Sequence, residues 1–320
     1  MLKIGVIGAG HLGKIHLRLL QESPHYELIG FYDTDIASGQ QLAREKNYTF
    51  FEQIDDLLEK VEVVDIVTPT LSHAELAEKC LRAGKHIFIE KPIANSVIEA
   101  QNITTLAHNM GLKGQVGHVE RFNPAFKSAL PHITQPMFIE IHRLAEFNPR
   151  GTDVPVVLDL MIHDLDIILS TVQSPVKKVE ASGVAVISET PDIANARITF
   201  ENGCVANLTA SRISLKNMRK SRFFQKDAYV SVDFLAKKVE IVKMKTPAAK
   251  TDDFALILEN AEGQKKQIYF ENPTIASNNA ILEELESLAN SIAKDQPTAV
   301  SLEDGTKALT LAYQIIDSYS

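Results

Sequence analysis

The sequence predicts an α/β protein in two parts: a doubly wound parallel sheet, followed by an α/β part with an open, mostly antiparallel sheet. Up to about residue 119, short apolar runs alternate with helical patterns, which is typical of parallel strands joined by helical crossovers. A glycine-rich turn follows the first run. From about residue 137 to 270 most segments look extended, and turn signals separate several of them.

Each strand of the parallel sheet is predicted from a short apolar run. These runs lie at 2–7, 27–32, 63–67, 86–89 and 113–119. The helical patterns between them, one at about 96–110, supply the crossovers that cover both faces of such a sheet. The whole pattern matches a doubly wound nucleotide-binding sheet, a type that has six strands in its usual form.

The second part contains further helices beside its extended segments. They are expected at about 155–171, 277–294 and 302–319. We place the domain boundary near 121–123, which gives residues 1–121 to the first domain and 122–320 to the second. Two domains suit a chain of 320 residues.

Composition narrows the function classes. The net charge of −8 argues against nucleic acid as the main partner, because phosphate binding needs a basic surface. The only cysteines, Cys80 and Cys204, are too far apart for a disulfide framework or a cysteine zinc site, so a reducing compartment is expected. No signal-peptide pattern and no apolar run near the roughly 18 residues of a membrane span are found. We therefore expect a cytoplasmic protein without membrane association.

The glycine-rich turn predicts phosphate binding. Gly8, Gly10 and Gly13 form G-x-G-x-x-G directly after a strand and at the start of a helix. In this pattern the first glycine permits a tight turn, the second lets a pyrophosphate approach the backbone, and the third lets the helix pack on the strand. The N-terminus of the helix offers free N–H groups to the phosphates.

A carboxylate follows at the expected distance. Asp33 comes about 20 residues after Gly13, where an acidic residue binds the adenosine ribose. A carboxylate repels a 2′-phosphate, so we expect NAD rather than NADP. The alternative is that Asp33 shares a helix-capping role with Asp35 and that the glycines serve only a turn.

Two further segments carry candidate catalytic groups. The strand at 86–89 continues into Glu90-Lys91-Pro92, and ligands of doubly wound sheets bind beyond the carboxyl ends of strands. Lys91 is therefore a candidate for the cofactor crevice, the alternative being an ordinary surface lysine.

The apolar helix at 155–171 contains Asp159, His163 and Asp166 at spacings that place all three on one face. They predict either a satisfied buried polar cluster or a proton-transfer site with His163 as its base. We expect no metal there, since the cofactor already supplies an electrophile.

Polar residues near the domain boundary and one basic cluster are candidate substrate contacts. Arg121 and Asn123, and with them His118 and Glu120, are expected near the cleft between the domains. The basic cluster is either a solvated surface or a site for an anionic substrate group. Its members are Arg212, Lys216, Arg219, Lys220 and Arg222.

Taken together, these motifs resemble the Gfo/Idh/MocA family (glucose-fructose oxidoreductase/inositol dehydrogenase type). The resemblance rests on "GAGHLG" at 8–13, "TPTLSHAELAEKCLRAGKHIFIEKP" at 68–92, Asp159-x-x-x-His163-x-x-Asp166 and the segment "LEELESLANSIAKDQPTAVSLEDGTKALTLAYQIIDS". It covers nearly the whole chain. It implies a Rossmann domain that binds NAD or NADP, a second domain for substrate binding and oligomerisation, and a homodimer or homotetramer.

The resemblance also implies roles for individual residues. Lys91 is the expected active-site lysine, His163 the catalytic acid/base and Asp159 its neighbour in the substrate site. The residues expected to contact the cofactor are Gly8, Gly10, His11, Leu12, Gly13, Asp33, Thr68, Pro69, Thr70, His73, Glu90 and Lys91. Those expected to contact the substrate are Lys91, Arg121, Asn123, Asp159, His163 and Arg212. A cis peptide bond is expected at Lys91–Pro92 or Glu90–Lys91.

The substrate class follows from a finer resemblance. Many family members have a glycine between the Asp and the His, where this chain has Met161. Together with "GHVERFNPA", this resembles a subgroup acting on nucleotide sugars, in particular UDP-N-acetylglucosamine 3-dehydrogenases. We therefore expect oxidation of a secondary sugar hydroxyl to a ketone, with Lys91 and His163 converging on it. The alternatives are a dehydrogenase of a free sugar or inositol, and a non-catalytic NAD-responsive regulator on the same fold.

Overall fold

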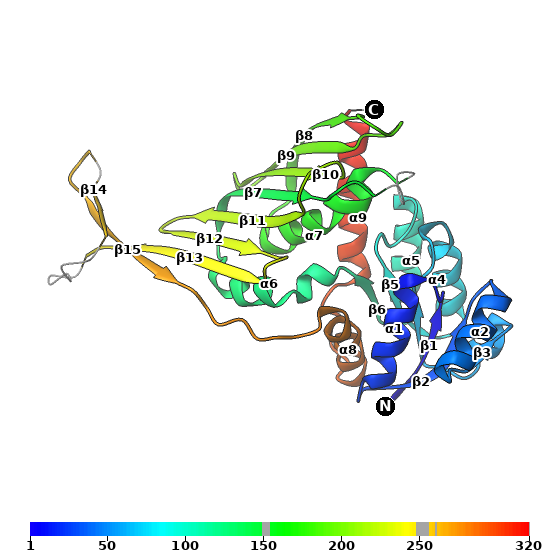
Figure 1. Cartoon of the computed structure of the whole chain (residues 1–320). Coiled ribbons are helices and arrows are strands. Elements are labelled where there is room, and N and C mark those ends of the chain that lie inside the picture. Colours follow the sequence, from blue (N-terminus) through cyan, green and yellow to red (C-terminus); the bar gives the residue numbers. More distant parts are fainter. Residues whose placement is uncertain (149–153, 248–255, 260, 320) are drawn as a thin grey trace. The chain divides into compact units, whose positions relative to one another are not determined.

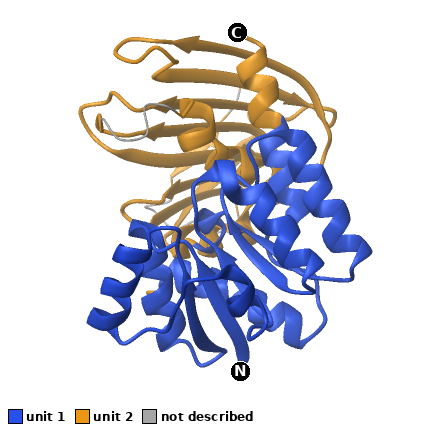
Figure 2. Cartoon of the chain, turned by 90° about the vertical axis from the view of Figure 1, so that its right-hand side faces the viewer, with its two compact units in different colours: residues 1–122, 279–310 blue, residues 123–278, 311–320 orange. Residues whose placement is uncertain are grey.

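The chain forms two compact units in the computed structural model (Figure 2). The structure describes residues 1–148, 154–247, 256–259 and 261–319. The first unit comprises residues 1–122 and 279–310, and the second comprises 123–278 and 311–320. The predicted boundary near 121–123 agrees with this division. The assignment of all residues after 122 to the second domain does not, because residues 279–310 belong to the first unit.

A six-stranded parallel sheet forms the centre of the first unit (Figure 1). Its order is β3-β2-β1-β4-β5-β6. Strands β2 and β3 are therefore added on one side of β1, and strands β4 to β6 are added on the other side. Ligands of doubly wound sheets bind at such a switch point. The short β3 was not among the predicted runs, since two residues carry no pattern. The strands are β1 (Leu2–Ile7), β2 (Tyr26–Tyr32), β3 (Phe50–Phe51), β4 (Val63–Ile66), β5 (His86–Glu90) and β6 (Gly114–Gly117).

Helices from both ends of the chain cover this sheet. They are α1 (His11–Glu22), α2 (Ile36–Lys46), α3 (Ile54–Leu58), α4 (His73–Arg82), α5 (Val97–Asn109), α8 (Ala280–Ala293) and the first part of α9 (Leu302–Asp317). Leu285 and Leu288 of α8 pack into one core cluster with Ile4 and Leu20. The hydroxyl of Tyr26 also donates to the carbonyl of Leu285 at 2.8 Å. These contacts explain why residues 279–310 belong with the first unit.

A nine-stranded sheet forms the second unit (Figure 1). Its order is β14-β15-β13-β12-β11-β7-β10-β9-β8, and its pairs are antiparallel except for β7 with β10. This confirms the open, mostly antiparallel sheet. The strands are β7 (Pro136–Leu144), β8 (Val176–Val184), β9 (Ile193–Phe200), β10 (Val205–Ser211), β11 (Met218–Gln225), β12 (Ala228–Asp233), β13 (Lys238–Lys245), β14 (Ile257–Glu259) and β15 (Lys265–Glu271).

Helices α6 (Pro124–Ala129) and α7 (Ile162–Thr171) pack on the second sheet. Along β7 the side chains alternate: Ile139 and Ile141 are buried, whereas Phe138 and Glu140 are half-buried. The helix predicted at 155–171 begins with a π-helical turn, Val157–Met161, before α7. Such turns break the regular i→i+4 ladder and occur often at functional sites. Within the described ranges, no helix is both long enough and apolar enough to cross a membrane.

The turn before β9 is held by one buried carboxylate. Asp192 accepts hydrogen bonds from the backbone N–H groups of Val186, Ile187 and Ser188 at 2.9, 2.7 and 3.0 Å. Burial opposes its ionisation, but these N–H groups outweigh burial and hold the pKa of Asp192 well below its usual range. The ionised form therefore stabilises the fold at neutral pH.

Asp192→Asn is expected to lower the apparent melting temperature by a few degrees at pH 7, because the amide oxygen is a weaker acceptor. A lowered pKa stabilises the fold above the unfolded value of about 3.9 and loses this effect as the pH falls toward the folded value. The deficit should therefore shrink between pH 5 and pH 3 in thermal melts. The control is Glu189→Gln, which removes the charge of an exposed side chain in the same turn. A deficit that does not change over this range would contradict the assignment.

Candidate functional site

The glycine-rich turn has the geometry that phosphate binding needs. Gly8 has a φ of 97°, in the left-handed region that favours glycine. A Cβ on Gly13 would lie 2.1 Å from the Gly8 carbonyl oxygen, so only glycine lets α1 pack this closely. A Cβ on Gly10 would meet nothing within 4 Å. The protein itself therefore leaves the space beside Gly10 open, as a pyrophosphate requires.

The carboxylate of Asp33 lies beside this turn. It accepts hydrogen bonds from the Ala9 N–H at 2.6 Å and from the Asp35 N–H at 2.9 Å. The side chain of Asp35 alone caps α2, through the Ser38 N–H at 2.9 Å. The alternative in which Asp33 shares the cap is thus wrong. This arrangement suits the binding of an adenine dinucleotide, because it combines Asp33 with exposed Gly10 and the N-terminus of α1.

Asp33→Ala is expected to weaken NAD binding about 10- to 100-fold, the usual cost of losing a charged hydrogen-bond partner. It should weaken NADP binding less, because the variant no longer repels a 2′-phosphate. Calorimetric titration with both dinucleotides measures this. The matched control is Asp35→Asn, which removes a charge two residues away but keeps a good helix cap. Equal losses for both dinucleotides would exclude a role of Asp33 in cofactor choice.

Two loops follow the next strands of the sheet. In the loop after β4, the Ser72 hydroxyl donates to the Thr68 hydroxyl at 2.8 Å. Between them the chain passes through exposed Pro69 and half-buried Thr70. His73 is buried, and its ring nitrogens lie 2.9 Å from the carbonyl oxygens of Thr68 and Pro92. Burial lowers the pKa of His73 although both carbonyls oppose this.

His73 therefore braces the two loops against each other. Both its ring nitrogens face backbone carbonyls, and its expected contact with the cofactor stays a prediction. Lys91 lies in the braced loop, half-buried, directly beyond the carboxyl end of β5. The bond between Lys91 and Pro92 is cis, one of the two expected positions.

A group of buried and half-buried ionisable side chains lies next to Lys91, and of its members the sequence analysis named only Glu90. We call His16, Asp65, Glu90 and Glu284 the Glu90 cluster. The His16 Nδ1 lies 2.9 Å from Asp65 Oδ2, and its Nε2 lies 3.5 Å from Glu90 Oε1. His16 and Asp65 are fully buried. A charged residue within the four-residue apolar strand β4 was the available sequence signal.

The pKa values of His16, Glu90 and Glu284 are all raised above their usual range. Burial acts to lower the pKa of His16, but Asp65 and Glu90 raise it by more, so the net shift is upward. Burial raises the pKa of Glu90, against the opposing effects of His16 and Lys91. Burial, together with Glu90 and Asp65, raises the pKa of Glu284 well above its usual range. The shift favours the neutral form of Glu284.

In the second unit, the candidate base lies at the start of α7. Asp159 belongs to the π-helical turn and His163 to the first turn of α7, and both are half-buried. Asp166, three residues after His163, is buried. The neighbouring Asp164 forms a buried two-bond pair with Arg143 of β7, at 2.9 and 2.8 Å. This pair fixes α7 next to His163.

The basic cluster predicted at 212–222 is not one surface. Arg212 is buried and donates to the carbonyl of Val154, so it braces the chain before the π-helical turn. Lys220 and Arg222 form ion pairs with Asp233 at 3.7 Å and with Glu140 at 2.8 Å. Strand β11 places alternate residues on opposite faces. Lys216 and Arg219 are exposed.

The boundary residues are largely used by the protein itself. Asn123 caps α6 by accepting from the Ala125 N–H at 3.1 Å and donates to the Phe234 carbonyl at 3.1 Å. These bonds give Asn123 a structural role, and its expected substrate contact stays a prediction. Arg121 is half-buried, with its guanidinium 3.9 Å from Asp304. His118 and Glu120 are buried.

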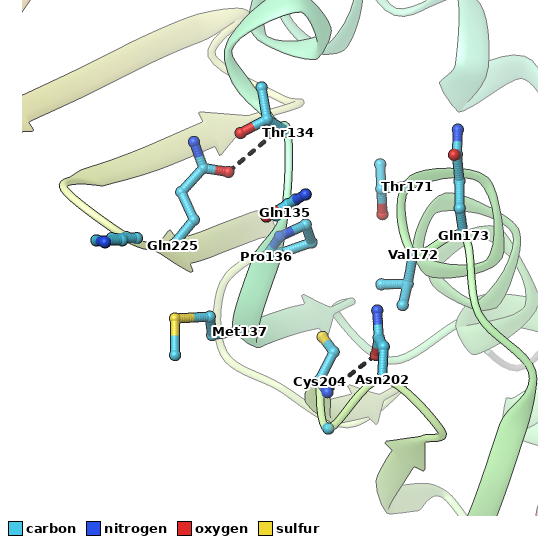
Figure 3. A pocket seen from close by; sticks show the side chains of 12 residues that line it. Thr134, Gln135, Pro136, Met137, Thr171, Val172, Gln173, Asn202, Cys204 and Gln225 are labelled. Carbon is cyan, nitrogen blue, oxygen red and sulfur yellow. Dashed lines mark hydrogen bonds between the residues drawn. The ribbon is translucent and has the colours of Figure 1, made fainter.

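A cavity of about 900 Å³ lies elsewhere in the second unit (Figure 3). It is bounded by the end of α7 and the start of β7, away from the end of α7 that carries His163. Two of its amides serve the backbone: Gln225 accepts from the Thr134 N–H at 2.9 Å, and Asn202 accepts from the Cys204 N–H at 3.0 Å. In the part of the chain that is described, no group of three or more metal-binding side chains is present.

Known proteins share this architecture over the full chain. Residues 2–118 match the oxidoreductase family with an NAD-binding Rossmann fold, and residues 108–225 match the Gfo/Idh/MocA C-terminal domain. A UDP-N-acetylglucosamine 3-dehydrogenase from Acidithiobacillus ferrooxidans is 34% identical over 98% of this chain and 96% of its own length. Its solved structure gives a TM-score of 0.89 at 33% identity and covers 99% of this chain and 97% of that one.

A more distant structure shows the fold alone. Scyllo-inositol dehydrogenase from Lactobacillus casei, solved with NAD(H) and scyllo-inositol, gives a TM-score of 0.78 at 23% identity and covers 100% of this chain and 97% of that one. The glycine turn, Asp33 and the sheet order agree with the family's NAD-binding part. The chain is therefore an oxidoreductase of the Gfo/Idh/MocA family with an NAD-binding Rossmann fold.

Proposed function

We propose that this enzyme oxidises the 3-hydroxyl of UDP-N-acetylglucosamine to a ketone, with NAD as hydride acceptor. The observation that carries the proposal is the similarity to a UDP-N-acetylglucosamine 3-dehydrogenase across nearly the whole of both chains. The chain also retains Lys91, Asp159 and His163 together, which a sensor without catalysis would not need.

Each proposed role follows from the chemistry of the side chain. His163 removes the hydroxyl proton as general base, and Asp159 orients it in the substrate site. Lys91 hydrogen-bonds the reacting oxygen and stabilises the negative charge that develops there. NAD, which the glycine turn and Asp33 would hold, would supply the hydride acceptor for the same carbon. The alcohol thus loses one hydride and one proton, which balances the reaction.

The substrate is tested by absorbance at the NADH wavelength. The purified enzyme is incubated with UDP-N-acetylglucosamine, UDP-glucose, free N-acetylglucosamine, glucose and myo-inositol, each with NAD and with NADP. We expect the highest kcat/KM with UDP-N-acetylglucosamine and NAD. A preference for a free sugar or inositol would support the second enzymatic reading. NAD binding without turnover of any of these compounds would favour a regulator.

The proposal also covers the compartment, the oligomeric state and the binding partners of the enzyme. We propose a cytoplasmic homodimer or homotetramer that binds neither nucleic acid nor membranes. In its support, Cys80 and Cys204 are free and buried, as suits a reducing compartment. On the second sheet, the exposed ring of Phe224 contacts the half-buried rings of Phe138 and Tyr229 at centroid distances of 5.7 and 5.0 Å, and the three offer an apolar surface for a second copy. Light scattering after size-exclusion chromatography measures the assembly.

A further inference from the structure

The cavity at the end of α7 is large enough to hold a ligand of its own (Figure 3). Its volume of about 900 Å³ falls within the range of small-molecule sites. Four parts of the second unit form its walls: the segment before β7, the end of α7, the β9–β10 turn and the β11–β12 turn. Its described lining contains none of the residues that we assign to the proposed reaction.

Hydrogen bonds between neighbouring segments hold these walls in place. Gln225 donates to the His132 carbonyl at 2.7 Å and accepts from the Thr134 N–H at 2.9 Å, so it joins the end of β11 to the segment before β7. The Asn202 N–H donates to the Ser174 hydroxyl at 3.0 Å, which joins the β9–β10 turn to the segment after α7. The walls are therefore preformed, which saves a ligand the cost of ordering them.

The charges of the lining suit a neutral ligand better than an ion. Among the described lining residues Lys226 alone is charged, and it is exposed on the β11–β12 turn. One exposed cation is a poor match for a diphosphate, which is bound tightly by several charged or bidentate partners. A cationic ligand would find no carboxylate among these residues, and buried charges are costly unless they are paired.

Amide and hydroxyl groups supply the polar part of the lining. They belong to Thr134, Gln135, Thr171, Gln173, Asn202 and Gln225. The side chains of Gln135 and Gln173 are exposed, so a solute reaches their amides. Asn202 uses its amide oxygen for the Cys204 N–H at 3.0 Å and offers its amide nitrogen to a solute. Amides both donate and accept, as the hydroxyl groups of a sugar or cyclitol do.

The cavity is separate from the candidate base and from the aromatic surface of the sheet. Thr171 lies eight residues after His163 in α7, which is about 12 Å along the helix. Alternation along β7 places Met137 on the same face as buried Ile139 and places Phe138 on the opposite face. A second copy bound to the aromatic surface would therefore lie on the other face of the sheet from Met137.

We propose that this cavity is an accessory binding site for a neutral polyhydroxylated ring, such as a free hexose or an inositol. The amides would bind the hydroxyl groups, and Pro136, Met137 and Val172 would contact the C–H groups of the ring. This inference goes beyond the proposed function and does not depend on it, because the lining and the residues assigned to the reaction do not overlap.

Methionine methyl NMR of the whole enzyme tests the proposal without turnover. Two of the six methionines report on the two sites: Met137 lines the cavity, and Met161 lies in the π-helical turn two residues before His163. Substitution of each by leucine assigns its signal. Titration with myo-inositol, glucose and N-acetylglucosamine in the absence of NAD should shift the Met137 signal in a saturable way. UDP-N-acetylglucosamine with NAD should shift the Met161 signal and leave that of Met137 in place.

Variants of the exposed amides test which groups bind the ring. Gln173→Leu removes one amide at similar size and should weaken binding about three- to tenfold, the usual effect of losing one hydrogen bond. The double variant Gln135→Leu/Gln173→Leu should weaken it further. Gln314→Leu is the matched control, because it changes an exposed glutamine of α9 within the same unit, and it should leave the affinity unchanged. These surface changes leave the hydrogen bonds of Gln225 and Asn202 in place.

Three results would overturn the inference. They are a Met137 signal that none of the three compounds shifts, an affinity that the double variant leaves unchanged, and a Met137 signal that responds to protein concentration instead, because a second copy would then fill the cavity. The proposed function fails separately. A saturable shift of Met137 without turnover of UDP-N-acetylglucosamine would support the accessory site and refute the proposed substrate, whereas normal turnover with a silent Met137 signal would do the reverse.

Discussion

Replacing His163 with alanine is expected to lower kcat for UDP-N-acetylglucosamine oxidation by about 10²- to 10⁴-fold, the contribution of a well-placed general base. His163 lies in the first turn of α7, next to a π-helical turn and beside a helix position fixed by a buried ion pair. Its loss removes the proton acceptor but leaves the glycine turn and Asp33 untouched. NAD affinity, measured by calorimetry, should therefore be retained.

The control for this variant is His132→Ala, which removes a partly exposed histidine of the same unit. It should leave kcat unchanged. The pH profile adds an independent check: the acidic limb of kcat should disappear in His163→Ala, because protonation of a general base is what suppresses turnover at low pH. Near-normal turnover in His163→Ala would mean that another group takes the proton and that the assignment is wrong.

The parallel sheet and its cofactor turn could be predicted from the sequence because their signals are local. Gly8 has a left-handed φ and Gly13 packs on the Gly8 carbonyl, so both requirements are set within a few residues, and apolar runs mark the strands directly. The place of α8 could not be predicted. Its apolar stripe shows that the helix is buried on one side, but Leu285 and Leu288 contact residues more than 250 positions earlier in the chain. Periodicity alone does not name that partner.

A site residue that directly follows a strand could be predicted from the sequence. Contacts that join residues of several elements could not. Lys91 could be placed from the strand before it, whereas the link from Asp65 through His16 to Glu90 joins three separate elements. The error at Arg212 has another cause. Its clustering in sequence with Lys220 and Arg222 suggested one surface. However, Arg212 precedes β11 and is buried against the Val154 carbonyl, whereas Lys220 and Arg222 pair with acids of the neighbouring strands.

The largest loss of stability is expected on breaking the pair between Arg143 and Asp164. Both side chains are only 3% exposed, and the guanidinium donates through two nitrogens to the two carboxylate oxygens. Arg143→Met leaves the Asp164 carboxylate buried without this partner, which costs about 3–5 kcal/mol in comparable sites. Thermal or urea unfolding should show a correspondingly lower midpoint.

The double variant Arg143→Met/Asp164→Leu separates the cost of an unpaired charge from the value of the pair. A buried ion pair replaced by apolar groups of similar volume is often close to neutral, so the double variant should recover most of the lost stability. The kcat of the double variant then shows whether the ion pair also positions His163. If the pair also fixes the orientation of α7, the double variant should melt near the wild type but keep a reduced kcat, because His163 follows the helix. A double variant as unstable as Arg143→Met would show that the loss comes from packing around β7 and not from the stranded charge on Asp164.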